Sequence, residues 1–308
     1  DQACFSFDLY VDCSGFKSLL LEQAMGSKYV DYSKSLFTNS AIVTNIKNPS
    51  QIKSYTTAST MKNGWLWDIP LRDKNSLGYV YSSSFCSEDE AFSELKNKIP
   101  HVDDSYRTVK FRSGRHEECF KGNVVAFGNS YAFVEPLESS GVHMIIAGIQ
   151  ILMDKFPKTL SDHDSIYAIN KHLNAKWDHL RWFLALHFKF NKKVDSEFWR
   201  VNNKESDISG YDQILEIYRA NGPLRKAKNL NDKSLNRLLE TSIFRHNGFD
   251  IILLGQEVLP TRIDTEYLEK RRNSLKAKKR IWESIAKSAI PNTEALELIE
   301  MNPELVSI

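Results

Sequence analysis

The segment from Gly122 to Phe156 constrains the fold of this chain most. The apolar run Gly122 to Phe127 predicts a buried strand, and the polar sequence GNSYAFVEPLESSG follows it. Apolar residues then recur at helical spacing: Val142, Ile145, Ile146, Ile149, Leu152, Met153 and Phe156. Free N–H groups and the positive dipole end of such a helix favour a small anion beside Ser140 and Gly141. The alternative is an ordinary helix capped by Ser139 or Ser140.

Composition and charge indicate a soluble globular protein. The chain has 308 residues, of which 42% are hydrophobic and 26% charged, so it can form one large or two ordinary domains. A net charge of +2 gives little attraction to nucleic acid or anionic lipid. The longest apolar run, His143 to Met153, is far shorter than the roughly 20 residues that span a bilayer. We expect no partner nucleic acid and no membrane.

Metal and disulfide chemistry are not predicted. The four cysteines form no CxxC pair, and no His-x-x-x-His occurs with a partner carboxylate. A reducing cytoplasm is therefore the simplest location. His143, within the apolar stripe, is expected to be a hydrogen-bonded core or pocket residue.

Periodicity predicts an α+β fold in two parts. Residues 1–136 are rich in short strands, beginning with the alternation of Phe5, Phe7, Leu9 and Val11. Two helices interrupt them, near Lys17 to Ala24 and at Glu88 to Lys98, the second with a Ser87/Glu90 capping box.

Helical periodicity dominates residues 137–308. Four stretches carry it: Leu137 to Phe156, Asp164 to Phe190, Tyr211 to Ala220 and Thr265 to Ala289. In the last, Leu268, Leu275 and Trp282 share a face, so its lysines and arginines are expected on the solvent side.

Two tryptophans two residues apart stand in the sequence GWLWDIP, residues 64–70. In an extended chain Trp65 and Trp67 lie on one face, and Pro70 then stops regular pairing. The pattern WxWxIP, followed by GNSYAFVEPLESSG, resembles the flavin-dependent halogenases usually labelled tryptophan halogenases. Further similar segments cover most of the chain: Asp8 to Leu20, Phe111 to Arg115, Trp177 to Trp199 and Gly248 to Gln256.

The resemblance implies an α/β flavoprotein monooxygenase-like architecture. Residues 1–136 would belong to a sheet-rich FAD and substrate module, and residues 137–308 would form a helical, substrate-capping subdomain. The implied reaction uses reduced FAD, oxygen and chloride or bromide to halogenate an indole-like or phenolic compound other than free tryptophan. A separate flavin reductase would supply FADH2, and a homodimer is compatible with the family.

The resemblance also assigns site residues. Glu138 matches the catalytic glutamate, while Ser140 and Gly141 would bind the halide. The flavin would lie against Gly128, Asn129 and Pro136. The route from flavin to substrate would be lined by Trp65, Trp67, Ile69 and Pro70. Glu135 is expected to have a structural role near Pro136.

Two features predict that the sequence is a truncated fragment. The chain opens at Asp1 within a predicted strand, and no GxGxxG follows a strand. The family's catalytic lysine would lie in the missing half, so we expect the fragment alone to be inactive. The alternatives are a flavin-dependent aromatic monooxygenase of the same superfamily and a non-enzymatic helical adaptor.

Overall fold

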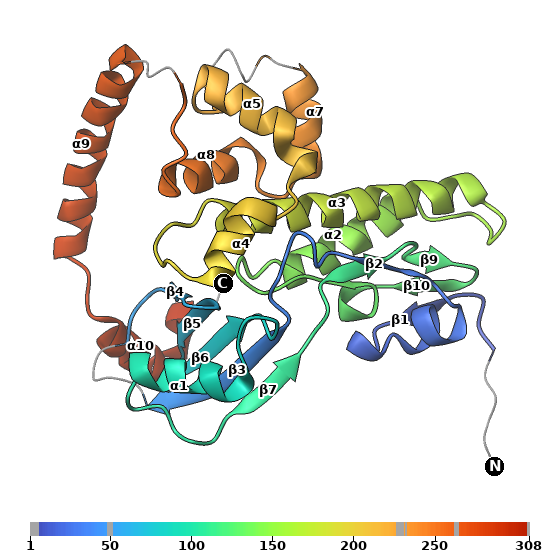
Figure 1. The fold of residues 1–308 in the computed structure, drawn as a ribbon, viewed down its shortest axis with the longest axis horizontal. Coiled ribbons are helices and arrows are strands. Elements are labelled where there is room, and N and C mark those ends of the chain that lie inside the picture. Colours follow the sequence, from blue (N-terminus) through green and yellow to red (C-terminus); the bar gives the residue numbers. More distant parts are fainter. Residues whose placement is uncertain (1–5, 48–51, 226–230, 232, 262–264, 307–308) are drawn as a thin grey trace.

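A five-stranded antiparallel sheet forms one end of the molecule (Figure 1). The computed structural model describes residues 6–47, 52–225, 231, 233–261 and 265–306. The sheet has the order β4-β5-β6-β3-β7 and contains β3 (Ser40–Lys47), β4 (Thr57–Met61), β5 (Gly64–Pro70), β6 (Lys74–Tyr81) and β7 (Arg107–Lys110). Helix α1 (Glu88–Lys98) packs on one face, where Leu66 and Tyr79 are buried. Because strand side chains alternate, Trp65 points to the opposite face.

Two three-stranded sheets lie beyond the large sheet. One contains β1 (Tyr10–Asp12), β9 (Phe120–Lys121) and β10 (Val124–Ala126); the other contains β2 (Tyr29–Asp31), β8 (Gly114–His116) and β11 (Ala132–Phe133). The pairing of β1 with β10 is parallel. The predicted sheet-rich first part is therefore confirmed, although several strands are shorter than the apolar runs suggested.

The apolar residues of the alternating pattern at the N-terminus are not the buried ones. Phe7 and Val11 are exposed, whereas Asp12 is 1% exposed. The Asp12 carboxylate accepts the amides of Leu20 and Leu21, each at 2.9 Å. These bonds fix the start of the segment after β1. In place of the helix predicted near Lys17 to Ala24, this segment forms a 3₁₀ turn (Gly15–Lys17) and a π-helix (Leu19–Ala24). Phe5 lies outside the described residues.

Helices dominate from Gly141 onward. Their bounds are α2 (Gly141–Asp154), α3 (His163–Lys189), α4 (Glu197–Glu205), α5 (Asp212–Asn221), α7 (Lys233–Thr241), α8 (Arg245–Gly255), α9 (Thr265–Lys287) and α10 (Asn292–Met301). Short 3₁₀ helices occur at Gly128–Ser130, Ser209–Tyr211 and Pro303–Val306. The predicted α1, with its Ser87/Glu90 capping box, is confirmed. Helix α2 begins at Gly141 rather than Leu137, because residues 137–140 form a turn.

One apolar core joins the sheet to the helices. It contains Trp65 and Val80 from the sheet and Phe183 and Trp199 from α3 and α4. An ion pair joins α3 to one of the three-stranded sheets as well. The Asp178 carboxylate on α3 accepts a hydrogen bond from Arg115 on β8 at 3.0 Å. The core thus includes residues from both sides of the domain boundary predicted between residues 136 and 137. That boundary stays a prediction.

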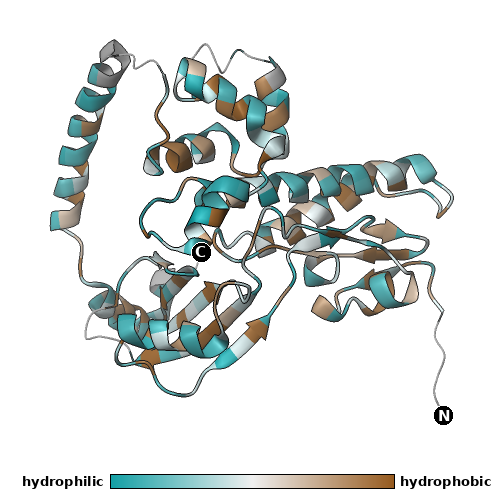
Figure 2. Cartoon of the chain, viewed as in Figure 1, coloured by the Kyte–Doolittle hydropathy of each residue, from teal (hydrophilic) through white to brown (hydrophobic). Residues whose placement is uncertain are grey.

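Two predicted burials are wrong. Figure 2 shows α9 as a largely hydrophilic helix at the edge of the molecule, and both Leu275 and Trp282 on it are 56% exposed. The side chain of Leu268 lies outside the described residues. His143 is exposed as well, because the first turn of α2 projects Val142 and its neighbours outward. Amphipathic spacing predicted these helices but not whether another element covers them.

Candidate active site

The turn from Glu135 to Gly141 connects β11 to α2 and organises the candidate site. The Ser139 amide donates to the Pro136 carbonyl at 2.9 Å, which closes the turn. Ser139 has a φ of 49°, an uncommon left-handed conformation for a residue with a side chain. Such backbone conformations concentrate at functional sites.

The first turn of α2 has unused hydrogen-bond donors. Ser140 occupies the N-cap position, but its side chain makes no capping bond, and no acidic residue stands in the first turn. Neither the Ser140 nor the Gly141 amide donates to an acceptor within the described part of the chain. Ser140 is buried and Gly141 is exposed, so these N–H groups are left for solvent or a ligand, and the positive end of the helix dipole favours a ligand with negative charge.

A cavity of about 220 Å³ lies in front of these amides; we call it the helix-start cavity. Its lining includes every residue that the sequence assigned to flavin and halide, namely Gly128, Asn129, Pro136, Ser140 and Gly141. Gly128 has a φ of 63°, and an added Cβ would lie 3.3 Å from Ile145. Glycine is therefore needed for both the backbone conformation and the close approach of α2.

The two tryptophans of β5 line a second cavity, the tryptophan cavity, of about 260 Å³. Their ring centroids are 6.0 Å apart, which confirms that they share one face of the strand. Ile69 lines the same cavity, whereas Pro70 ends β5 opposite Asn75 and is not part of the lining. The Trp67 ring covers Gly78: a Cβ added there would be 1.9 Å from the indole.

Glu135 fixes one of these tryptophans from within the core. The carboxylate is 1% exposed, and it accepts hydrogen bonds from the Trp65 indole N–H at 2.8 Å and the Thr38 hydroxyl at 3.2 Å. Its second oxygen, Oε1, has no partner among the described residues. Burial raises the pKa of Glu135 to about 7, because it disfavours the charged carboxylate. The hydrogen bonds from Trp65 and Thr38 lower the pKa but do not cancel this effect.

Glu138 points the other way, toward α3. Its carboxylate lies 2.7 Å from Nε2 of His187. The other ring nitrogen, Nδ1, is 3.1 Å from the Phe183 carbonyl, and a carbonyl oxygen can only accept, so Nδ1 carries a proton. The Nε2 contact then needs one more proton, held by either the carboxyl or the imidazole. Glu138 and His187 therefore form a pair that shares a proton.

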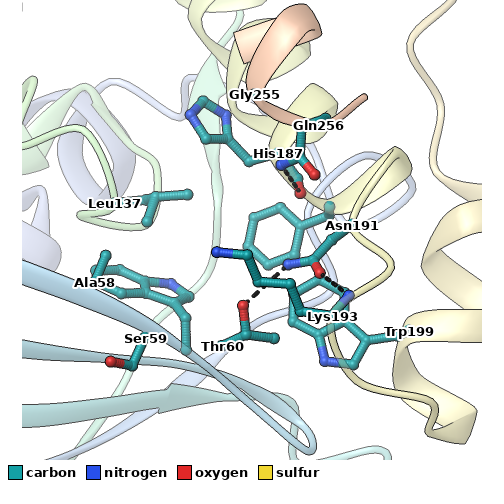
Figure 3. Close-up of a pocket in the computed structure, with 12 residues that line it drawn as sticks. Ala58, Ser59, Thr60, Leu137, His187, Asn191, Lys193, Trp199, Gly255 and Gln256 are labelled. Atoms are coloured by element: carbon teal, nitrogen blue, oxygen red, sulfur yellow. Dashed lines mark hydrogen bonds between the residues drawn. The ribbon is translucent and has the colours of Figure 1, made fainter. Parts of the chain in front are cut away.

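His187 lines a third cavity, the histidine cavity, of about 190 Å³ (Figure 3). Gln256 donates to the His187 carbonyl at 3.0 Å, and Asn191 donates to the Thr60 hydroxyl at 3.2 Å. These contacts tie α3 to α8 and to the edge strand β4. The cavity thus lies between the sheet and the helices.

Neighbouring cavities share lining residues along the turn. Pro136 and Ser139 line both the helix-start and the tryptophan cavities. Trp65 and Leu137 line both the tryptophan and the histidine cavities. The structure therefore brings together the predicted anion site, the tryptophans and Glu138.

The sequence did not identify the role of His187 or the contact of Glu135 with Trp65. His187 stood only in a segment of resemblance, and its partner Glu138 is 49 residues away. Glu135 was expected only to be structural near Pro136, whereas it holds the Trp65 ring. The position of Glu135 next to Pro136 was the one signal in the sequence that could have pointed to its role.

Comparison with known proteins identifies the family. The sequence profile described as "Tryptophan halogenase" matches residues 1–270. The chain belongs to the tryptophan halogenase family. Tryptophan 7-halogenase RebH from Lentzea aerocolonigenes is 36% identical over 222 residues, which cover 70% of this chain and 42% of RebH. The flavin dependence expected from the sequence is a property of this family.

Solved structures agree with this assignment. MibH, a lathipeptide tryptophan 5-halogenase, superimposes with a TM-score of 0.82 and 39% identity, covering 97% of this chain and 57% of MibH. BrvH, a flavin-dependent halogenase from Brevundimonas sp. BAL3, gives a TM-score of 0.80 and 26% identity, with coverages of 94% and 58%. The α+β fold class is therefore confirmed. The chain spans less than half the length of RebH and somewhat more than half of MibH.

Membrane-spanning helices and metal-binding clusters are both absent among the described residues. None of their helices has the length and apolar character needed to cross a membrane. Within the same ranges, no group of three His, Cys, Asp or Glu side chains could hold a metal ion.

Proposed function

We propose that this chain is the substrate side of a flavin-dependent halogenase. It would use FADH2, oxygen and chloride or bromide to halogenate an aromatic, indole-like or phenolic compound. The observation that carries this proposal is a row of cavities that share lining residues, with amides that lack an acceptor among the described residues at one end and His187, the partner of Glu138, at the other. Family membership supports the same reaction class.

The helix-start cavity fits a flavin edge and a halide. Gly128 leaves the backbone open for a close ligand, and Asn129 and Pro136 complete that wall. The Ser140 and Gly141 amides would hold the halide, because a helix N-terminus attracts an anion. Reduced flavin, when bound there, would activate oxygen, and oxygen would supply the oxidising equivalents that convert the halide into hypohalous acid.

The remaining residues would guide and complete the substitution. Trp65 and Trp67 exclude water along the tryptophan cavity, and Glu135 keeps the Trp65 ring in place. Glu138 orients the halogenating species or accepts the proton that the arene loses, and His187 shares that proton. Overall, one arene, one halide, one proton, FADH2 and O₂ give the halogenated arene, FAD and two waters.

Several finer statements belong to the same proposal. A separate flavin reductase would supply FADH2, and two copies of the enzyme would form a homodimer. Residues 1–136 and 137–308 would act as the flavin and substrate sheet module and the helical cap. The described cysteines Cys13, Cys86 and Cys119 are free thiols, which agrees with a reducing cytoplasm.

Product analysis tests the proposal. A chain extended to the length of its relatives would be incubated with FAD, a flavin reductase, NADH, oxygen, bromide and a panel of indoles and phenols. We expect a bromine isotope doublet in the product mass, above a control without the halogenase. A product that gains oxygen instead would favour the flavin-dependent monooxygenase, and no product from any arene would contradict the proposal.

A further inference from the structure

The polar groups that line the histidine cavity are almost all engaged with the protein. The Trp65 indole donates to Glu135, and the Trp199 indole donates to the Met61 carbonyl at 2.7 Å. Asn191 donates to Thr60 and accepts the Lys193 amide at 2.9 Å. Gln256 donates to the His187 carbonyl. These groups hold the cavity open but have little capacity left for a ligand.

Lys193 is the lysine of this lining, and it is an exposed residue. Figure 3 shows its side chain extending into the cavity, and its ammonium group has no hydrogen-bond or ion-pair partner among the described residues. The turn that carries it is fixed, because Asn203 donates to the Asn191 carbonyl at 3.0 Å while Asn191 accepts the Lys193 amide. The lysine is therefore held over the cavity by its backbone.

The charge of the lining is one-sided. The described lining residues include Lys193 and the ionisable His187 but no carboxylate, since Glu138 approaches His187 from outside that set. Apolar surface comes from Trp65, Leu137 and Phe188. An aromatic ring fits the apolar walls, and an anionic group fits the ammonium.

We propose that Lys193 binds a carboxylate carried by the aromatic substrate. This rests on the proposed function, because it takes the histidine cavity as the place where the arene lies. The ammonium is a single compact charge with three donors, suited to one carboxylate. Lys193 would therefore determine specificity and would take no part in halogen transfer.

Binding to the 308-residue chain tests this without flavin. Indole-3-acetate and indole-3-acetamide differ in charge and share the ring, and isothermal titration calorimetry measures the affinity of each. We expect the acetate to bind roughly fivefold more tightly at low salt, as a partly exposed charged hydrogen bond allows. Lys193→Met should remove that preference and leave acetamide binding unchanged.

Lys192 provides the matched control. It is the sequence neighbour of Lys193 and is likewise exposed, but it is not part of the cavity lining. Lys192→Met should keep the full preference for the acetate, and circular dichroism should show all variants folded. Because screening weakens exposed charge pairs, the preference should shrink in 1 M NaCl.

Four outcomes would overturn the inference. They are equal affinity of both probes for the parent chain, an equal loss in the Lys192 and Lys193 variants, retained acetate preference in Lys193→Met, and no binding of either probe. The first three would leave an aromatic site and the proposed halogenation intact, because halogenation is judged separately from the product mass.

Discussion

The two sides of the Glu135–Gly141 turn satisfy their polar groups in different ways. On the side of the sheet and α3, Glu135 accepts a hydrogen bond from Trp65, and the Glu138 carboxyl group is hydrogen-bonded to His187. On the α2 side, Gly141 begins a helix whose first amides lack acceptors within the described residues. The next residue of α2, Val142, is 69% exposed, so this side of the turn faces solvent.

This difference separates two chemical tasks along one short segment. On the carboxylate side, Glu135 and Glu138 find their partners on β5 and α3, so these groups are satisfied by the protein itself. The amide side is a local property of a helix N-terminus, where water or a bound anion can accept from the free N–H groups. Under the proposed function the first side handles the arene and its proton, and the second handles the halide.

The largest effect should follow from removing the charge of Glu138. Glu138→Gln keeps the size and the contact with His187 but cannot accept the arene proton. Halogenation by a chain of the relatives' length should fall by ~10²-fold or more, as for a lost general base. Single-turnover assays would measure this, with flavin binding unchanged as the control. Equal rates for parent and variant would remove Glu138 from the mechanism.

The buried Glu135 predicts a pH-dependent stability of the 308-residue chain. Its pKa rises from an ordinary 4.5 to about 7 on folding, so the folded state binds more protons between these values. Its contribution is complete below pH 4.5 and is lost as pH rises through 7, by at most about 3 kcal/mol. Glu135→Gln imitates the protonated acid and should lack this loss.

Urea unfolding at pH 5, 6, 7 and 8 would measure the difference. The stability of Glu135→Gln relative to the parent should increase steadily over this range. Parallel curves would mean that Glu135 does not hold a proton in the folded state near neutral pH.

The tryptophan cavity depends on the glycine under Trp67. Gly78→Ala would place a methyl group where the indole now lies, so the ring must move. We expect a loss of about 2 kcal/mol in the free energy of unfolding, typical of overpacking. Gly255→Ala is the control, because no atom lies within 4 Å of its added Cβ and the change should cost less than about 0.5 kcal/mol. Similar losses in both variants would argue against the packing of Trp67 on Gly78.

The same contrast explains what the sequence could predict. Local signals were sufficient for α1 with its Ser87/Glu90 capping box and for the common face of Trp65 and Trp67, but they placed the start of α2 at Leu137 instead of Gly141. The Glu138–His187 pair and the presence of Lys193 and Trp65 in one cavity lining depend on how distant segments pack together, which local spacing does not encode. The exposure of Trp282 has the same origin, because periodicity cannot say what covers a helix face.

The smallest effect should come from the Ser140 hydroxyl. Ser140→Ala removes one neutral donor near the halide and keeps both amides, so it should cost on the order of 1 kcal/mol, or about a fivefold higher bromide requirement. The bromide concentration for half-maximal rate would measure this. A rise of ~10²-fold would show that the hydroxyl, rather than the backbone, holds the halide.

The most direct test of the two-sided turn is a bromide titration of Gly141→Val beside Glu138→Gln, in a chain of the relatives' length. A Cβ added at Gly141 meets no protein atom within 4 Å, so we expect the valine variant to fold and its branched side chain to hinder an anion at the helix start. We predict that Gly141→Val raises the half-maximal bromide concentration far more than Ser140→Ala does and releases hydrogen peroxide in place of product. Glu138→Gln should lower the rate at unchanged bromide dependence. An unchanged bromide dependence in Gly141→Val, with product formation intact, would contradict the account and leave this turn as an ordinary helix start.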